Sequence, residues 1–177
     1  ADLVVVNHHL FFADAALKGE GVSELLPRAN AVIFDEAHQL PDTAATFFGE
    51  SLSARQIREL CRDCLSEAGH TAADLRALNE HTAATEKAVN DLRLAMGEEG
   101  RREPWKAIQE QQEVTQGVST LQSSLEALSA FLEPLRDANK GMESCARRAR
   151  EQLEALKRLT AAGDPGQVYW FENFRHA

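Results

Sequence analysis

Long hydrophobic runs are absent from this sequence of 177 residues. No apolar stretch approaches the roughly 20 residues that a membrane-spanning helix needs, and no signal or transit peptide is recognisable. Cysteine is also scarce. Three cysteines, an odd number without framework spacing, argue against a disulfide scaffold and favour a reducing compartment. We therefore expect a soluble, cytoplasmic protein without a membrane partner, as its 44% hydrophobic and 27% charged residues also suggest.

The sequence also lacks an excess of positive charge. Residues 1–100 hold 17 acidic against 8 basic side chains, residues 101–160 hold 9 against 10, and the whole chain has a net charge of −9. General affinity for nucleic acid depends on neutralising phosphates with Lys and Arg. Any DNA contact must therefore be local, or must depend on other parts of a larger protein.

Two adjacent carboxylates, Asp35 and Glu36, follow the apolar run of residues 31–34. The run predicts a buried strand, and ligands of open α/β sheets bind at the carboxyl ends of such strands. A strand end of this kind can place a magnesium ligand and a catalytic base beside a nucleotide. With Ala37 and His38 the spelling is Asp-Glu-Ala-His, which looks like the second ATPase motif (Walker B) of a superfamily 2 helicase. The alternative is a strand that merely ends in a polar turn.

The phosphate loop that normally partners such a motif, Gly-x-x-x-x-Gly-Lys-Ser/Thr, is missing. Residues 3–35 nevertheless predict a βαβ unit, with strands at 3–6 and 31–34 and a helix at 10–17. Two strands alone make an unstable sheet, so we expect this unit to belong to a larger one. Half of a nucleotide site is therefore present and half is missing.

From residue 53 onward the apolar pattern becomes helical. We expect helices over 53–69, 71–96, 104–134 and 139–163, followed by a strand at 168–171 that could return to the sheet. The signals for their ends are caps, glycines and prolines: Ser53 with Gln56, Gly69, Thr71, Gly97, Gly100, Pro104, Pro134, Gly163 and Pro165. The predicted fold class is mainly α, with long antiparallel helices inserted into a small α/β piece.

Two segments carry a family resemblance. Ala-Asp-Leu-Val-Val-Val-Asn-His-His-Leu at residues 1–10 resembles the segment before the Walker B motif in the DinG/XPD group of iron–sulfur DNA helicases. Phe-Asp-Glu-Ala-His-Gln-Leu at residues 34–40 resembles the motif itself. Bacterial members look closest. These motifs cover about the first forty residues, and the rest matches only in layout.

The resemblance implies an organisation and an activity. Residues 1–52 would form part of a RecA-like motor domain 1 with the Asp-Glu-Ala-His (DEAH) box, 53–163 a helical arch, and 164–177 a return strand. Members are ATP-dependent helicases that unwind DNA in the 5′-to-3′ sense in repair and replication, and their cluster cysteines would lie outside this chain. The chain alone would be inactive, because the phosphate loop and the second motor domain are absent from it.

The resemblance also assigns roles in the motif. Asp35 would hold Mg²⁺ of the ATP complex, Glu36 would orient and deprotonate the attacking water, and His38 would couple the nucleotide site to the DNA side. His8 and His9 invite a metal-site interpretation, but adjacent side chains after a strand point to opposite sides, so structural roles are favoured.

Cys61 and Cys64 have the spacing of half a zinc or iron–sulfur site, but no second pair accompanies them. Their place on the apolar face of a predicted helix favours burial in the core, and Cys145 is likewise on an inner face. We therefore expect them to bind neither metal nor cluster.

Basic residues concentrate on the last predicted helix. Arg147, Arg150 and Arg158 share a face with Glu154 between them, so a solvated face is the commoner explanation and a DNA-guiding surface the alternative. The aromatic run at 169–171 could stack on bases; in a returning strand it would instead pack the arch against the motor domain.

Three functions remain open. The favoured one is a piece of an iron–sulfur helicase whose arch helps enclose single-stranded DNA. The second is a helical protein-interaction module that docks a replication or repair partner through its acidic surface. The third is a small stand-alone ATPase with an unusual phosphate loop.

Overall fold

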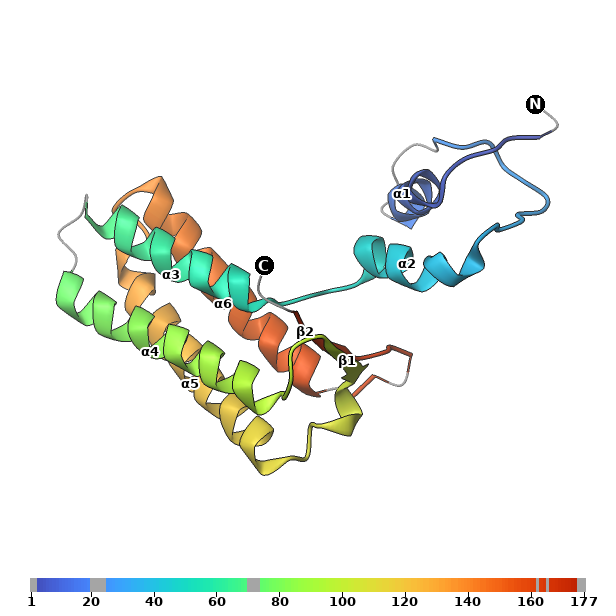
Figure 1. Ribbon diagram of the computed structural model, residues 1–177. Coiled ribbons are helices and arrows are strands. Elements are labelled where there is room, and N and C mark those ends of the chain that lie inside the picture. Colours follow the sequence, from blue (N-terminus) through green and yellow to red (C-terminus); the bar gives the residue numbers. More distant parts are fainter. Residues whose placement is uncertain (1–2, 20–24, 70–73, 162, 165, 175–177) are drawn as a thin grey trace. The chain divides into compact units, whose positions relative to one another are not determined.

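The computed structural model describes residues 3–19, 25–69, 74–161, 163–164 and 166–174. The chain divides into two compact units, Ala1–Glu50 and Ser51–Ala177 (Figure 1). Within the described ranges no helix combines the length and the apolar character that crossing a membrane requires.

The first unit consists of α1 (His8–Gly19), the 3₁₀ turn η1 (Ala37–Gln39) and α2 (Leu40–Phe48). Helix α1 was predicted, and Asn7 stabilises its start because its Oδ1 accepts the Leu10 N–H at 2.8 Å. Helices α1 and α2 pack against each other through phenylalanine rings. Phe12 of α1 lies 6.3 Å from Phe47 and 5.9 Å from Phe48 of α2, measured between ring centroids.

The predicted strands at 3–6 and 31–34 are wrong as strands. Neither segment is assigned to a strand among the described residues, and most of their apolar side chains face solvent. Leu3 is 81%, Val5 88% and Ile33 95% exposed. The physical reason is that a parallel pair needs neighbouring strands and covering helices to bury both faces. The described part of the first unit supplies two short helices and no neighbouring strand.

The second unit is an antiparallel bundle of four helices, so the prediction of a mainly α fold is confirmed. The helices are α3 (Ala54–Ala68), α4 (Leu75–Ala95), α5 (Gln112–Leu132) and α6 (Lys140–Ala161). They alternate in direction, and each contacts two neighbours, so that α3 closes the bundle against α6 (Figure 1).

Local capping chemistry sets several of the helix ends. Ser53 and Gln56 form the predicted capping box, with the Gln56 N–H donating to Ser53 Oγ at 3.2 Å and the Ser53 N–H to Gln56 Oε1 at 2.7 Å. The expected cap at Thr71 lies outside the described residues, and Asp74 caps α4 instead. Gly97 follows α4 with a φ of 95°, a conformation that favours glycine.

The bundle core forms two apolar clusters along its length. One lies under the Trp105 end and contains Leu92, Val114, Leu121 and Leu125. The other contains Leu60, Cys61, Cys64, Leu78, Leu128, Leu132, Met142 and Cys145. Side chains of this kind contribute about 1.5–3 kcal/mol each when fully buried, so the bundle carries the main hydrophobic core of the chain.

The third predicted helix begins later than expected. Pro104 does not open it; residues Arg101–Pro104 form strand β1, Trp105–Ala107 form the 3₁₀ turn η2, and α5 begins at Gln112. Strand β1 pairs antiparallel with β2 (Trp170–Asn173), with Arg102 opposite Glu172 and Pro104 opposite Trp170. The predicted last strand thus exists, shifted by two residues. Its described partner, β1, is in the second unit, and a return to the first unit stays a prediction.

Candidate functional site

The Asp-Glu-Ala-His box forms an exposed turn between the extended segment 31–34 and helix α2. Asp35 and Glu36 lie in a bend, and His38 is in η1. The Glu36 N–H donates to Asp35 Oδ1 at 3.0 Å, and the Glu36 carbonyl accepts the Gln39 N–H at 3.0 Å. Among the described residues the second Asp35 oxygen has no hydrogen-bond partner, and all three polar side chains of the box are exposed.

Glu36 has an unusual backbone. Its φ of 50° and ψ of 45° lie in the left-handed region, and it is the one non-glycine residue with positive φ among the described residues. Such a conformation costs of order 1 kcal/mol or more for a residue with a Cβ, and persists where surrounding structure demands it. Here it turns the chain so that Glu36 Oε2 lies 3.1 Å from His38 Nδ1. The structure therefore brings the side chains of Glu36 and His38 into contact.

Aromatic packing supports the start of the box. Phe34 makes an edge-on contact with Phe11 of α1, with ring centroids 5.0 Å apart, and lies 6.1 Å from the His8 ring. His9 instead faces Phe47, at 6.1 Å. The two histidines thus contact different aromatic partners, in keeping with the structural roles predicted for them.

Sequence reasoning missed Asp14, a buried carboxylate in α1 that is 4% exposed. Its Oδ1 accepts the Leu25 and Leu26 N–H groups at 2.7 and 2.9 Å, and its Oδ2 pairs with Lys18 Nζ at 2.8 Å. The bond with Lys18, followed by the bond with the Leu26 amide, lowers the pKa of this carboxyl. The available signal was a single acid within an apolar helix, four residues before a lysine. Asp14 fixes the chain that leads toward the box.

Two curated relatives share nearly the whole of this sequence. Both are named ATP-dependent DNA helicase YoaA. The protein of Haemophilus influenzae is 39% identical over 173 residues, covering 97% of this chain and 27% of the relative. The protein of Escherichia coli is 36% identical over 172 residues, with the same shares. This chain is homologous to one segment of the YoaA helicases. No family profile and no solved structure match it.

The YoaA match confirms the resemblance inferred from the first forty residues and extends it through the helical unit. The chain spans about a quarter of the length of these relatives, 27% in each case.

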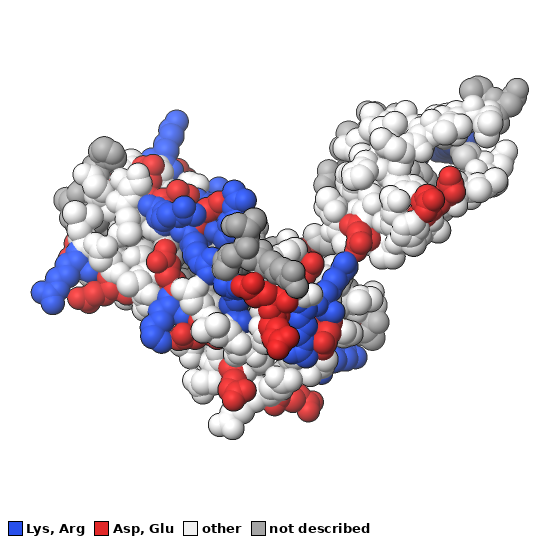
Figure 2. Space-filling model, in the orientation of Figure 1, with Lys and Arg blue, Asp and Glu red and all other residues white. Residues whose placement is uncertain are grey.

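The basic residues of α6 in this YoaA-like segment are mostly paired with acids. Arg147 pairs with Glu151 at 2.8 Å, and Arg150 pairs with Glu133. On the face drawn in Figure 2, Lys and Arg are intermixed with Asp and Glu over the second unit. Arg147, Arg150 and Arg158 therefore do not form a separate positive surface, and their role in guiding DNA stays a prediction.

The cysteines are buried in the bundle, as predicted for Cys61, Cys64 and Cys145. Burial raises the pKa of Cys61 to about 12. The hydrogen bond between the Cys64 and Cys145 thiols, together with burial, raises the pKa of Cys64. Thiols held neutral in this way are poor metal ligands and poor nucleophiles. Among the described residues no group of three His, Cys, Asp or Glu side chains could hold a metal ion.

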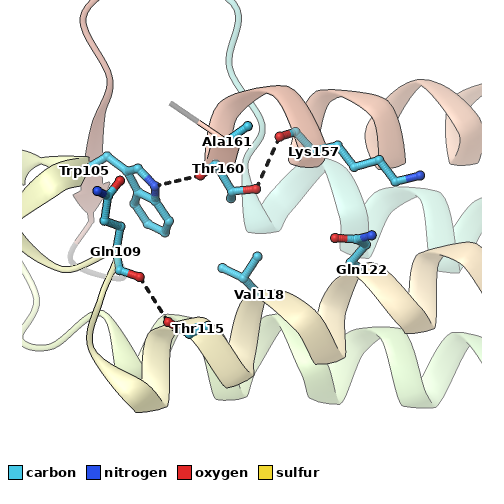
Figure 3. A pocket seen from close by; sticks show the side chains of 8 residues that line it. All are labelled: Trp105, Gln109, Thr115, Val118, Gln122, Lys157, Thr160 and Ala161. Atoms are coloured by element: carbon cyan, nitrogen blue, oxygen red, sulfur yellow. Dashed lines mark hydrogen bonds between the residues drawn. The ribbon is translucent and has the colours of Figure 1, made fainter. Parts of the chain in front are cut away.

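A hollow of about 310 Å³ opens between η2, α5 and α6 (Figure 3). The Trp105 indole N–H donates to the Thr160 carbonyl at 3.2 Å, and the Thr115 hydroxyl donates to the Gln109 carbonyl at 3.0 Å. Lys157 lies at its edge and pairs with Glu126 at 3.2 Å, which raises the pKa of the lysine. Because that cation is already neutralised, the hollow has no group suited to a nucleotide phosphate.

Proposed function

We propose that this chain is the segment of an ATP-dependent DNA helicase that carries the DEAH box and a helical arch. The observation that carries the proposal is the 36–39% identity to the YoaA helicases over 97% of the chain. The box geometry agrees with it, because an extended apolar segment ends in exposed adjacent carboxylates at a left-handed turn. Residues held in sparsely populated backbone conformations cluster at functional sites.

Asp35 and Glu36 fit a magnesium–nucleotide complex in their chemistry. Mg²⁺ prefers oxygen ligands, keeps several waters and is commonly held by one or two carboxylates plus substrate phosphates. When bound, it neutralises charge on the phosphates and orients them for attack. In this proposal Asp35 binds through its free carboxylate oxygen, and Glu36 accepts a proton from the attacking water. His38, which contacts Glu36, couples the nucleotide site to the DNA-binding side of the helicase.

The four-helix bundle serves as the arch in this proposal. Its long antiparallel helices, packed on two apolar core clusters, make a stiff element that helps enclose single-stranded DNA during 5′-to-3′ unwinding. The direction of unwinding and the enclosure follow from the family resemblance. Basic and acidic side chains are intermixed on the drawn face of the bundle. This charge pattern supports a surface that guides DNA with low general affinity more than one that binds DNA tightly.

A second function, docking of a replication or repair protein, is favoured by one observation. The chain has a net charge of −9, which suits a basic protein partner better than a nucleic acid. Specific capture of such a partner by the bundle, with no effect of bundle mutations on unwinding, would favour this alternative.

Glu36→Gln in the full-length helicase tests the proposal. The amide keeps the shape of the carboxylate but cannot accept a proton. We therefore expect DNA-stimulated ATP turnover to fall by roughly 10²–10⁴-fold, as is typical for loss of a general base, while ATP affinity is retained. Asp35→Asn should instead weaken magnesium-dependent nucleotide binding. Turnover near that of the wild type in Glu36→Gln would contradict the assignment.

The same substitution in the 177-residue chain is the folding control. The Glu36 and His38 side chains are 62% and 73% exposed, and ion pairs this exposed contribute little to stability. The melting temperature of the Glu36→Gln chain should match the wild type. A large drop would identify Glu36 as a structural residue.

A further inference from the structure

The β1–β2 ribbon has one buried and one exposed face. Phe171 and Asn173 point into the bundle and are 5% and 4% exposed. The pairing register and the burial pattern place Arg102, Pro104, Trp170 and Glu172 on the opposite face. Within the aromatic run, for which base stacking was the less favoured alternative, Phe171 is therefore in the core, and Trp170, at 42% exposed, is available to a ligand.

A flat cation covers part of the exposed ring. The Arg102 guanidinium carbon lies 5.5 Å from the centroid of the Trp170 ring, and Arg102 and Trp170 are diagonal neighbours across the two strands. Val168 and Phe174 flank β2 and are 80% and 67% exposed. The face therefore presents a guanidinium stacked over part of an indole ring, with exposed apolar side chains at both ends of β2.

The ribbon is held firmly from its buried face. Asn173 Nδ2 donates to the Gly97 carbonyl at 2.7 Å, and its Oδ1 accepts from Arg93 Nε at 3.2 Å. The Gly100 N–H donates to the Asn173 carbonyl at 2.6 Å, and the Trp105 N–H to the Tyr169 carbonyl at 2.9 Å. A platform fixed in this way loses little conformational entropy when a ligand stacks on it.

The size and chemistry of the face suit a nucleobase better than a protein. A stable protein interface uses about 20–30 residues on each side, whereas these strands have four residues each. Pro104, which has no N–H, blunts the edge of β1 against pairing with an added strand. Bases of single strands, in contrast, stack on individual aromatic rings and on guanidinium planes without sequence preference.

The geometry points to a single-strand stacking platform at Arg102 and Trp170, on which one or two unpaired bases of DNA lie against the indole and the guanidinium plane that covers part of it. This inference rests on the proposed DNA-dependent function and assigns it a contact point in the arch. Glu172 lies opposite Arg102 and limits the positive charge, so stacking provides most of the affinity.

The test is a titration of the 177-residue chain with a fluorescently labelled oligothymidylate of 15 nucleotides, read by anisotropy. We expect weak binding, with a dissociation constant on the order of 10⁻⁴ M, near the weak end of non-specific DNA binding. Trp170→Ala should weaken it about 5- to 150-fold, which corresponds to the loss of one stacked base. Trp170→Phe should retain most of the binding. Arg102→Ala should also weaken it, because the guanidinium plane is part of the stacking surface.

Matched controls separate this platform from general effects. Arg76→Ala removes an exposed cation from α4, and Leu75→Ala removes an apolar side chain that is 47% exposed; neither should change binding. Trp105 is 6% exposed, so quenching of the intrinsic fluorescence by the oligonucleotide should persist in Trp105→Phe. Circular dichroism melts confirm that each variant is folded.

Three results would overturn the inference: no binding of the oligonucleotide by the folded chain, binding that Trp170→Ala leaves intact, or a concentration-dependent dimer that buries Trp170. None of them affects the proposed ATPase role of Glu36, because that role is measured on the full-length helicase. Loss of turnover in Glu36→Gln together with intact binding in Trp170→Ala would remove the platform alone.

Discussion

Single residues of this chain show where local chemistry is unusual. Glu36 has the one positive φ of a non-glycine residue in the described part, and Asp14 is a charged group almost fully buried in an apolar helix. Both belong to the first unit, where the carboxylates of the box are exposed and the Asp14 carboxylate is buried. Position 36 was predicted as a site from its sequence context. Asp14 was not, because its partners Leu25 and Leu26 come from a loop more than ten residues away.

Asp14 makes a testable contribution through its titration. A carboxyl with a lowered pKa in the folded state stabilises the fold above its unfolded value of 3.8, and that stabilisation is lost as the pH falls through the folded value. The Leu25 and Leu26 amide protons, which bond to Asp14, should therefore titrate with a midpoint below 3.8 in NMR spectra.

Two variants check the cause of that shift. Lys18→Met removes the largest contributor and should move the midpoint upward, and Asp14→Asn should abolish the titration of both amides. A midpoint at or above 3.8 in the wild-type protein would show that the folded state does not favour the charged carboxylate.

At the scale of secondary structure, capping residues predicted the ends of several helices well. The pairing of β1 with β2 could not be predicted in this way. Ser53 and Gln56, the glycines after α4 and Pro134 after α5 gave ends within a few residues of those observed. Trp105 and Ile108 are spaced like helical residues, yet they lie before α5. The reason is that residues 101–104 pair with residues 170–173, about seventy positions away, a contact that no local pattern carries.

The contact of α4 with α5 depends on a glycine. A Cβ at Gly117 would lie 3.1 Å from Leu92 Cδ1 and 3.2 Å from Leu92 Cα, closer than ordinary packing. Gly117→Ala gains about 1 kcal/mol of helix propensity but overpacks the core at a cost of about 1–3 kcal/mol. We expect the free energy of unfolding in urea to fall by roughly 1 kcal/mol.

Gly163→Ala is the matched control, because a Cβ there would meet only the Ala161 carbonyl oxygen, at 3.9 Å. Its free energy of unfolding should stay within about 0.5 kcal/mol of the wild type. If Gly117→Ala instead raised the stability by its full propensity gain, α4 and α5 would not be packed as closely as the structure shows.

At the scale of the whole molecule, the two units differ in how far they bury their apolar side chains. The first unit leaves Leu3, Val5 and Ile33 exposed, while the bundle buries most of its large apolar side chains. Local propensity alone cannot hold an isolated segment as a strand, which explains why the strand predictions failed. The three residues singled out from the motif, Asp35, Glu36 and His38, nevertheless lie in one turn of the structure. In our proposal the box works only with a phosphate loop and a second motor domain, so we expect the 177-residue chain alone not to hydrolyse ATP.

The most direct test of the proposed function is unwinding by the full-length helicase that contains this segment. A duplex with a 5′ single-stranded tail is incubated with magnesium and ATP, and strand separation is compared between wild type and Glu36→Gln. We expect ATP-dependent separation by the wild type and its loss in Glu36→Gln, with DNA and ATP still bound. Full unwinding by Glu36→Gln, or none by the folded wild type, would contradict the assignment of this segment to a helicase motor.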